Sequence, residues 1–115
     1  MNDVRRGELW WVTVIGQDSE PAGRRPALVL QTDAANKQPR YPNTIVVLLS
    51  TIGRENLPFH IKITPSIANG LNTISYVKCE QLLTISKHRL ESLIGIITSE
   101  EMRLIEAGIR IVLNL

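Results

Sequence analysis

The chain has 115 residues, a length that fits one domain with a modest core and requires no disulfide or metal to hold it together. Thirteen Lys and Arg against eleven Asp and Glu give a formal net charge of +2, which permits a polyanionic partner without demanding one. The single cysteine, Cys79, excludes an intramolecular disulfide and a multi-cysteine zinc site, and we expect it to be a small buried apolar residue. We therefore treat residues 1–115 as a single domain.

The N-terminus lacks the pattern of a targeting segment. MNDVRRGELWW carries charges, but no apolar stretch with a small-residue cleavage site follows it. No run of about 18 apolar residues occurs anywhere in the chain. We expect a soluble, cytoplasmic protein without a membrane partner.

Three strands are predicted in the first half of the chain. Residues 7–15 (GELWWVTVI) are rich in aromatic and β-branched side chains and end at the turn-prone GQDSEPAG. Residues 25–32 (RPALVLQT) and 43–51 (NTIVVLLST) have the same character. Prolines, asparagines and mixed charge rule out a continuous strand over residues 33–43, which leaves room for one short helical turn.

Three more strands are predicted at residues 59–64 (FHIKIT), 74–85 (ISYVKCEQLLTI) and 88–97 (HRLESLIGII). The first alternates apolar and polar residues, so it should be half buried, and the second is expected to bend near Glu80. Between these two, Asn69-Gly70 is a turn dipeptide that favours positive φ.

The hydrophobic period then changes from strand to helix. Thr98 and Glu101 have the spacing of a capping box, and the acidic first turn suits the positive end of a helix dipole. Gly108 lies inside this helix, where it either admits a close neighbour or marks an early break. One helical face collects the apolar residues Met102, Ile105, Ile109 and Val112. The whole pattern predicts a mainly β (α+β) fold, a small antiparallel barrel closed by a C-terminal helix.

Several kinds of chemistry lack their sequence signals. His60 and His88, the only histidines, are far apart and without the carboxylate spacing of a metal site, so we expect no metal. No GxGxxG or P-loop follows a strand, and we expect no cofactor. A Ser-His-Asp triad stays open from composition, but no GxSxG elbow supports it.

The turn at residues 19–26 is the strongest candidate for chemistry. Arg24 and Arg25 stand between Gly23, which lets a backbone approach closely, and Pro26, which fixes the chain before a core strand. If Glu20 folds back to orient one guanidinium, the remaining N–H donors are free to grip a phosphate. The alternative is a solvated ion pair among these three side chains, and spacing alone favours that alternative.

Hydroxyl groups mark a second candidate position. Ser50 and Thr51 end the strand predicted at residues 43–51, where hydroxyls also serve as turn-formers. They would share a pocket with the arginine turn only if that strand pairs with the strand at residues 25–32.

The combined motifs resemble the MazF/PemK family of toxins from toxin-antitoxin systems. The resemblance spans nearly the whole chain, in order, through RRGELWWV, DSEPAGRRPALVLQTD, TIVVLLST, LPFHIKI, CEQLLTI and LIEAGIRIVL. It implies an SH3-like, CcdB/PemK-type, strongly bent antiparallel barrel. It also implies a homodimer that cleaves single-stranded RNA at a short recognition sequence without a metal.

The resemblance assigns roles to individual residues. Arg25 matches the family's catalytic arginine, and the family's catalytic threonine falls on Ser50, with Thr51 beside it, so either hydroxyl remains a candidate. Arg25 would grasp the phosphate and relay a proton, and Glu20 or another group would share the proton transfer because an arginine is a poor free base. The other matched residues would line the active site or the RNA groove: Ser19, Glu20, Glu80 and Gln81. Arg24 stands where the family varies and would at most position a phosphate.

Base selection should come from loop contacts, because proteins read RNA as splayed single strands. The candidates are Leu57, Pro58 and Phe59, although the alternation of Phe59 with Ile61 and Ile63 favours a core position for its ring. The implied products end in 2′,3′-cyclic phosphate and 5′-OH.

Two rival functions remain. A CcdB-like protein of this fold inhibits DNA gyrase by binding, without the arginine-hydroxyl site, and a non-catalytic module would bind RNA or a protein without cutting. Under the toxin interpretation the natural partner is a cognate antitoxin whose acidic, disordered segment folds on binding.

Overall fold

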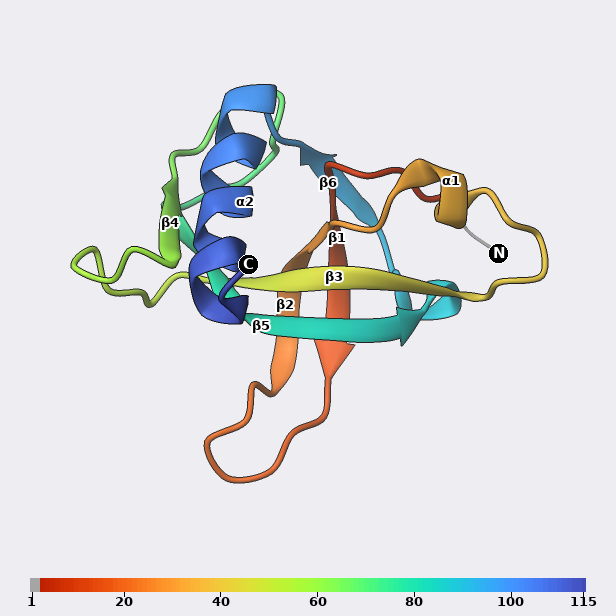
Figure 1. Ribbon diagram of the computed structural model, residues 1–115, viewed down its shortest axis with the longest axis horizontal. Helices are drawn as coiled ribbons and strands as arrows, with labels where there is room; N and C mark the ends of the chain where they lie inside the picture. Colours follow the sequence, from red (N-terminus) through yellow and green to blue (C-terminus); the bar gives the residue numbers. More distant parts are fainter. Residues whose placement is uncertain (1–2) are drawn as a thin grey trace.

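The computed structural model describes residues 3–115 and shows one curled sheet with a helix packed against it (Figure 1). The elements are β1 (Glu8–Val14), β2 (Gly23–Val29), α1 (Asp33–Asn36), β3 (Asn43–Ser50), β4 (His60–Ile63), β5 (Ser75–Ser86), the 3₁₀ turn η1 (Lys87–Arg89), β6 (Leu93–Ile96) and α2 (Ser99–Leu113). Six antiparallel strands are ordered β4-β5-β3-β2-β1-β6, and the sheet curls so strongly that β1 and β2 run steeply across β3 and β5 (Figure 1). The predicted mainly β fold with a C-terminal helix is confirmed as a curled half-barrel.

The sheet is apolar on both faces, because side chains alternate along each strand. The helix face, covered by α2, buries Leu9, Leu28, Leu49, Val77 and Cys79 together with Ile105 of the helix. The opposite face, called the far face here, buries Trp10, Val12, Ala27, Val46 and Leu48. Because β1, β2, β3 and β5 contribute to both clusters, the face of a neighbouring polar residue on these strands follows from its register.

Helix α2 begins and packs as its sequence predicts. The Thr98 hydroxyl accepts from the backbone N–H of Glu101, whose carboxylate accepts from the N–H of Thr98, which completes the capping box. Ile105 is fully buried against the sheet, which stabilises the fold by about 1.5–3 kcal/mol. A methyl group at Gly108 would lie 2.6 Å from the Cys79 sulfur, so the glycine admits a close neighbour and the helix continues past it. Within residues 3–115 no helix is long and apolar enough to cross a membrane.

The predicted strand at residues 88–97 is wrong in its first half. Only Leu93–Ile96 forms a strand, and Lys87–Arg89 instead forms the turn η1, capped by the Ser86 hydroxyl. The side chain of Lys87 is buried and donates to the carbonyl oxygens of Asn36 and Tyr41 at 2.7 and 2.9 Å, so the start of η1 is bonded to the segment after β2. The chain rejoins β1 at Glu91, whose N–H donates to the carbonyl oxygen of Trp11 at 2.9 Å. The other five predicted strands are confirmed within a few residues, and α1 is the expected short helical turn.

Strand β5 bends at the predicted place. Val47 pairs with Leu82 and Leu49 pairs with Val77, so the four residues Lys78–Gln81 lie opposite the single residue Leu48. Such a bulge bends a strand and re-aims its side chains. Cys79 and Leu82 both pack on the helix face although they are three positions apart. It follows that Glu80 and Gln81 both project from the far face.

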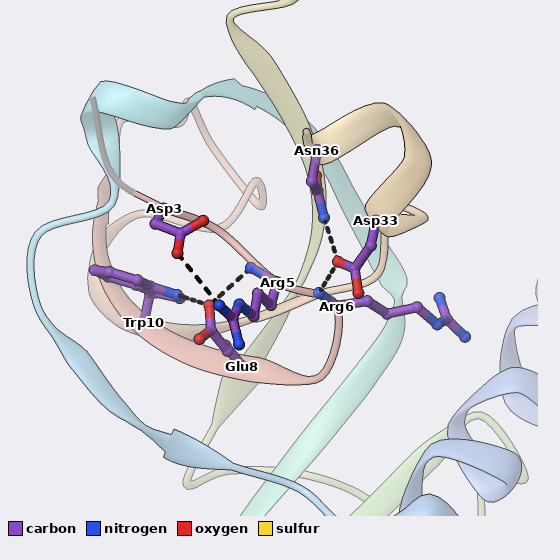
Figure 2. A network of polar contacts seen from close by, with 7 residues as sticks. All are labelled: Asp3, Arg5, Arg6, Glu8, Trp10, Asp33 and Asn36. Carbon is purple, nitrogen blue, oxygen red and sulfur yellow. Dashed lines mark hydrogen bonds and ion pairs between the residues drawn. The ribbon is translucent and has the colours of Figure 1, made fainter. Parts of the chain in front are cut away.

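The RGE segment near the N-terminus, residues Arg6, Gly7 and Glu8, makes contacts that stabilise the fold (Figure 2). One carboxylate oxygen of Glu8 accepts from the backbone N–H of Arg5 and the indole N–H of Trp10. The backbone N–H of Arg6 donates to Asp33 at 2.7 Å and lowers the pKa of that carboxyl group. Gly7 between them has φ +95°, which favours glycine. This motif anchors β1 to the start of α1.

Candidate active site

The pairing of β2 with β3 brings the arginine turn to the hydroxyl position. Ala27 pairs with Leu48 and Leu28 with Val47, and Arg25 and Ser50 each lie two residues beyond the last of these pairs, on the two neighbouring strands. Arg25 is also the partner of Val12, and Ser50 follows Leu48 by two positions, which places both side chains on the far face. The pairing of the two strands that a shared site requires is present.

Arg25 has an unused donor inside this region. Its Nε donates to the carbonyl of Ala22 at 3.2 Å, while its Nη1 is buried and has no partner. Among the side chains of residues 3–115, only one other buried polar atom lacks a partner, the Oε1 of Gln81. The two residues stand on the strands either side of β3, and both face the same way. Buried polar atoms are nearly always paired, so an unpaired donor and an unpaired acceptor here indicate a place for a polar ligand.

The two candidate hydroxyls differ in position. Ser50 is the last residue of β3 and pairs with Tyr76 of β5, and its Oγ accepts from the backbone N–H of Ile52 at 3.1 Å. The hydroxyl thus forms a turn, yet its hydrogen remains available for donation to a ligand. Thr51 lies beyond the strand and is exposed. Of the two hydroxyls, that of Ser50 lies on the same face of the sheet as Arg25.

The β1–β2 loop does not arrange its charges as expected. Glu20 accepts from the backbone N–H of Gln17 at 2.6 Å and closes its own turn, and the described residues show no ion pair between Glu20 and either arginine. The expected ion pair among Glu20, Arg24 and Arg25 is therefore wrong. Ser19 lies exposed in the same loop, which projects from the sheet in Figure 1.

Arg24 points away from Arg25, because adjacent strand residues face opposite sides. Its Nε lies 3.0 Å from a carboxylate oxygen of Glu91, and its guanidinium lies 4.4 Å from the centre of the Trp11 ring. The Thr13 hydroxyl and then the Arg24 guanidinium lower the pKa of Glu91. This network fixes the outer side of β1 and β2 and keeps Arg24 apart from the far face.

The β3–β4 loop is fastened to β5 on the far face. The Tyr76 hydroxyl donates to Glu55 at 3.0 Å, and Lys62 lies 3.2 Å from the same carboxylate oxygen. Lys62 and then Tyr76 lower the pKa of Glu55, while this contact raises the pKa of Tyr76. A methyl group at Gly53 would lie 2.3 Å from the Tyr76 ring, so the loop backbone rests directly on it. The loop next to Ser50 thus has a defined position.

The predicted base-contacting residues are divided between core and surface. Phe59 is partly buried and packs against the helix-face core, the position that its alternation favours. Leu57 is partly buried and Pro58 is exposed. Of the three predicted residues, Leu57 and Pro58 are the two that do not belong to the helix-face core.

His60 is the residue that sequence reasoning missed. Its side chain is 6% exposed, and its two ring nitrogens contact the backbone N–H of Arg54 at 3.1 Å and a carboxylate oxygen of Glu80 at 2.8 Å. The available signal was its alternation with Ile61 and Ile63, which places His60 on the far face. That signal has meaning only once the far face is known to carry the site.

The chemistry open to this arrangement is that of anion binding with proton transfer. It combines a guanidinium, a hydroxyl and a carboxylate on one face. Residues 3–115 contain no group of three or more His, Cys, Asp or Glu side chains suited to a metal ion. Cys79 is buried, and burial raises the pKa of its thiol to about 11, so it is no nucleophile at neutral pH.

Comparison with known proteins identifies the family and the fold of the chain. The model of the family of PemK-like, MazF-like toxins of type II toxin-antitoxin systems matches residues 5–113. The chain is 30% identical to the endoribonuclease MazF of Staphylococcus saprophyticus, with 97% of this chain and 92% of that protein covered. Its fold is similar to that of MazF (Form-I) from Deinococcus radiodurans, with a TM-score of 0.81, 18% identity and full coverage of both chains. It is also similar to an endoribonuclease solved in complex with its cognate antitoxin from a mycobacterial species, with a TM-score of 0.79, 24% identity and coverage of 97% and 96%.

Proposed function

This chain belongs to the family of PemK-like, MazF-like toxins of type II toxin-antitoxin systems, and from that premise we propose that it is an endoribonuclease that cuts single-stranded mRNA at a short recognition sequence without a metal ion. The observation that carries the proposal is the partnerless Nη1 of Arg25 on the face that holds Ser50. A buried guanidinium donor that lacks a protein acceptor is well suited to a phosphate oxygen.

The reaction uses the RNA's own 2′-OH as the nucleophile. Its oxygen attacks the adjacent phosphorus, the bond to the 5′-oxygen breaks, and the products end in a 2′,3′-cyclic phosphate and a 5′-OH. Arg25 donates to the non-bridging oxygens as negative charge builds on them, and the Ser50 hydroxyl donates a second hydrogen bond. DNA, which lacks the 2′-OH, is not cut.

A proton must leave the 2′-OH and another must reach the departing 5′-oxygen. A guanidinium with a pKa above ~12 is suited to donate and poorly suited to accept, so a carboxylate shares the work. Glu20 and Glu80 are the two carboxylates among the proposed site residues. Glu20 of the β1–β2 loop is the carboxylate proposed for this proton transfer, whereas Glu80, one of whose oxygens is bound by His60, is assigned to a contact with an RNA base.

Sequence selection is assigned to the groups around this centre. Gln81 has a free amide oxygen for a base or ribose donor, while Leu57 and Pro58 offer apolar surface to a splayed base. Ser19 and Glu20 approach the RNA from the β1–β2 loop. Arg24 is held by Glu91, so any phosphate that it contacts lies outside the catalytic centre.

Two protein partners belong to this proposal. Relatives solved with antitoxins support an antitoxin that neutralises this chain by covering its RNA groove. A homodimer is supported by exposed apolar residues near the end of α2 and a groove of about 360 Å³ beside them, lined among others by Ile45, Leu82, Leu113 and Leu115. Sedimentation equilibrium tests the dimer, and a monomer mass at micromolar concentration would reject it.

Cleavage of a long single-stranded RNA in EDTA tests the enzyme. Wild-type protein should give discrete cuts with cyclic phosphate ends, and Arg25→Ala should lower the rate by about 100-fold or more, as removal of a key transition-state donor does. Arg40→Ala, an exposed arginine on the α1–β3 connection, is the matched control and should cut normally. Products with 3′-OH ends would refute the mechanism. Intact RNA with every protein would direct attention to gyrase inhibition or to a binding role.

A further inference from the structure

His60 connects two parts of the site that are separate in the sequence. It opens β4, directly after the loop that follows Ser50, and shares the far face with Tyr76 and Lys78 through its register with β5. Its side chain is 6% exposed, which is low for a residue beside a solvent-facing site. The ring is also bordered by Phe59, whose ring meets it edge-on at 5.3 Å between centres. It is therefore held firmly in one orientation.

Both ring nitrogens of His60 have a hydrogen-bond partner. Nδ1 has a backbone N–H as its partner, the one of Arg54 at 3.1 Å, so it acts as an acceptor and carries no proton. The proton therefore lies on Nε2, which donates to Glu80 at 2.8 Å. One ring fixes the β3–β4 loop with one nitrogen and the bulge of β5 with the other.

The bulge of β5 explains why the contact between His60 and Glu80 matters for the site. Because Glu80 and Gln81 both project from the far face, a shift of the Glu80 carboxylate would move an exposed acceptor on the face of Arg25 and Ser50. The Glu80 side chain is 38% exposed, so one carboxylate oxygen is bound by His60 while the group still reaches solvent. A carboxylate held in this way can accept from an exocyclic amino group, which adenine, cytosine and guanine carry, or from a ring N–H, which guanine and uracil carry.

We propose that His60 is a positioning residue for sequence discrimination: it holds the Glu80 carboxylate and the Arg54–Phe59 loop in one arrangement, in which Glu80 accepts from a base donor of the RNA. The inference rests on the proposed ribonuclease function and deepens it. His60 does not touch the scissile phosphate, so its contribution is to the choice of sequence and to KM, while Arg25 and Ser50 determine kcat.

Three substitutions of His60 distinguish its hydrogen bond with the Arg54 amide from its hydrogen bond with Glu80. His60→Gln keeps a donor near the position of Nε2, and His60→Asn keeps an acceptor near the position of Nδ1, whereas His60→Ala removes both. Hydrogen exchange at the Arg54 amide verifies the design, since it should be slow in wild type and His60→Asn and faster in the other two. His88→Ala is the matched control, because the other histidine is exposed on η1.

The measurement is kcat and KM on short RNAs that carry the mapped cleavage sequence or single-base changes of it, well below the Tm of each variant. His60→Ala and His60→Asn should reduce discrimination at one base position by about 10-fold, chiefly through KM, because one oriented hydrogen bond is lost. Glu80→Ala should lose discrimination at the same position. His60→Gln should restore most of it, and His88→Ala should match wild type.

A purely structural role for His60 predicts a different result. All RNAs would then be cut more slowly by one common factor, in step with a lowered Tm, and His60→Gln would give no rescue at the affected base; that pattern overturns the inference while leaving the ribonuclease in place. A wild-type protein that cuts no RNA overturns the proposed function itself, and this inference with it.

Discussion

Arg24 and Arg25 are adjacent and chemically identical, yet they have different surroundings. Strand alternation turns Arg24 toward Trp11 and Glu91, where its charge is paired. The same alternation turns Arg25 to the face of Ser50 and leaves one donor buried without an acceptor. At this scale a site residue is identified by an unsatisfied group rather than by its type.

The same reasoning separates the two candidate hydroxyls. Ser50→Ala should lower the cleavage rate by about 10- to 100-fold, because a hydrogen bond to the developing charge is lost. Thr51→Ala should retain most activity, since this side chain lies past the strand and is exposed. Single-turnover cleavage of one RNA, with Tm measured for both variants, decides between them. The reverse order would assign the hydroxyl to Thr51 and would require the strand end to move on RNA binding.

Two irregular features of the secondary structure, the bulge of β5 and a glycine in α2, help to position the site. The bulge of β5 turns Glu80 and Gln81 to one face, and Gly108 lets α2 approach β5 so closely that a methyl group would meet the Cys79 sulfur. The bulge and the helix contact share Cys79, which lies within the bulge and under the helix. Packing on the helix face therefore supports the geometry of the far face.

Gly108→Ala tests this support. The added methyl group would lie 2.6 Å from the Cys79 sulfur, so despite the better helix propensity of alanine we expect a loss of about 1–3 kcal/mol in the free energy of unfolding. Cys79→Ala in the same chain should recover part of that loss, because it removes the clashing atom. Urea unfolding of the two single variants and the double variant gives the coupling free energy between positions 108 and 79. Additive effects would show that the helix does not press on the bulge.

For the whole molecule, carboxylates connect segments that are distant in the sequence. Asp33 accepts from Arg6, Glu55 from Tyr76 and Glu91 from Thr13, and each of these three carboxyl groups has a lowered pKa. Their folded-state pKa values lie below those of the unfolded chain. Their contribution to stability is therefore present above the unfolded pKa and is lost as pH falls through the folded values.

The free energy of unfolding should accordingly change little between about pH 7 and pH 5 from these groups, and fall below about pH 4. Asp33→Asn should be less stable than wild type at neutral pH and lose less on acidification, because one of the three linked groups is gone. Urea unfolding at a series of pH values measures both effects. If the free energy of unfolding had the same pH dependence in both proteins, Asp33 would not contribute to the loss of stability in acid.

The sequence by itself determined the strands, the capped helix, the bend of β5 and the arginine turn, because alternation, helical period and turn residues are local properties of the chain. It also carried the family motifs, although the RGE motif proved to be structural, with Glu8 bound to Arg5 and Trp10. Only the tertiary structure decided that residues 87–89 leave the sheet, that Glu91 rather than Glu20 pairs with Arg24, and that His60 joins the loop to Glu80. These contacts depend on strand pairing and on burial, which bring together residues far apart in the sequence. Arg24 and Glu91, for example, are 67 positions apart, and no local pattern specifies such partners.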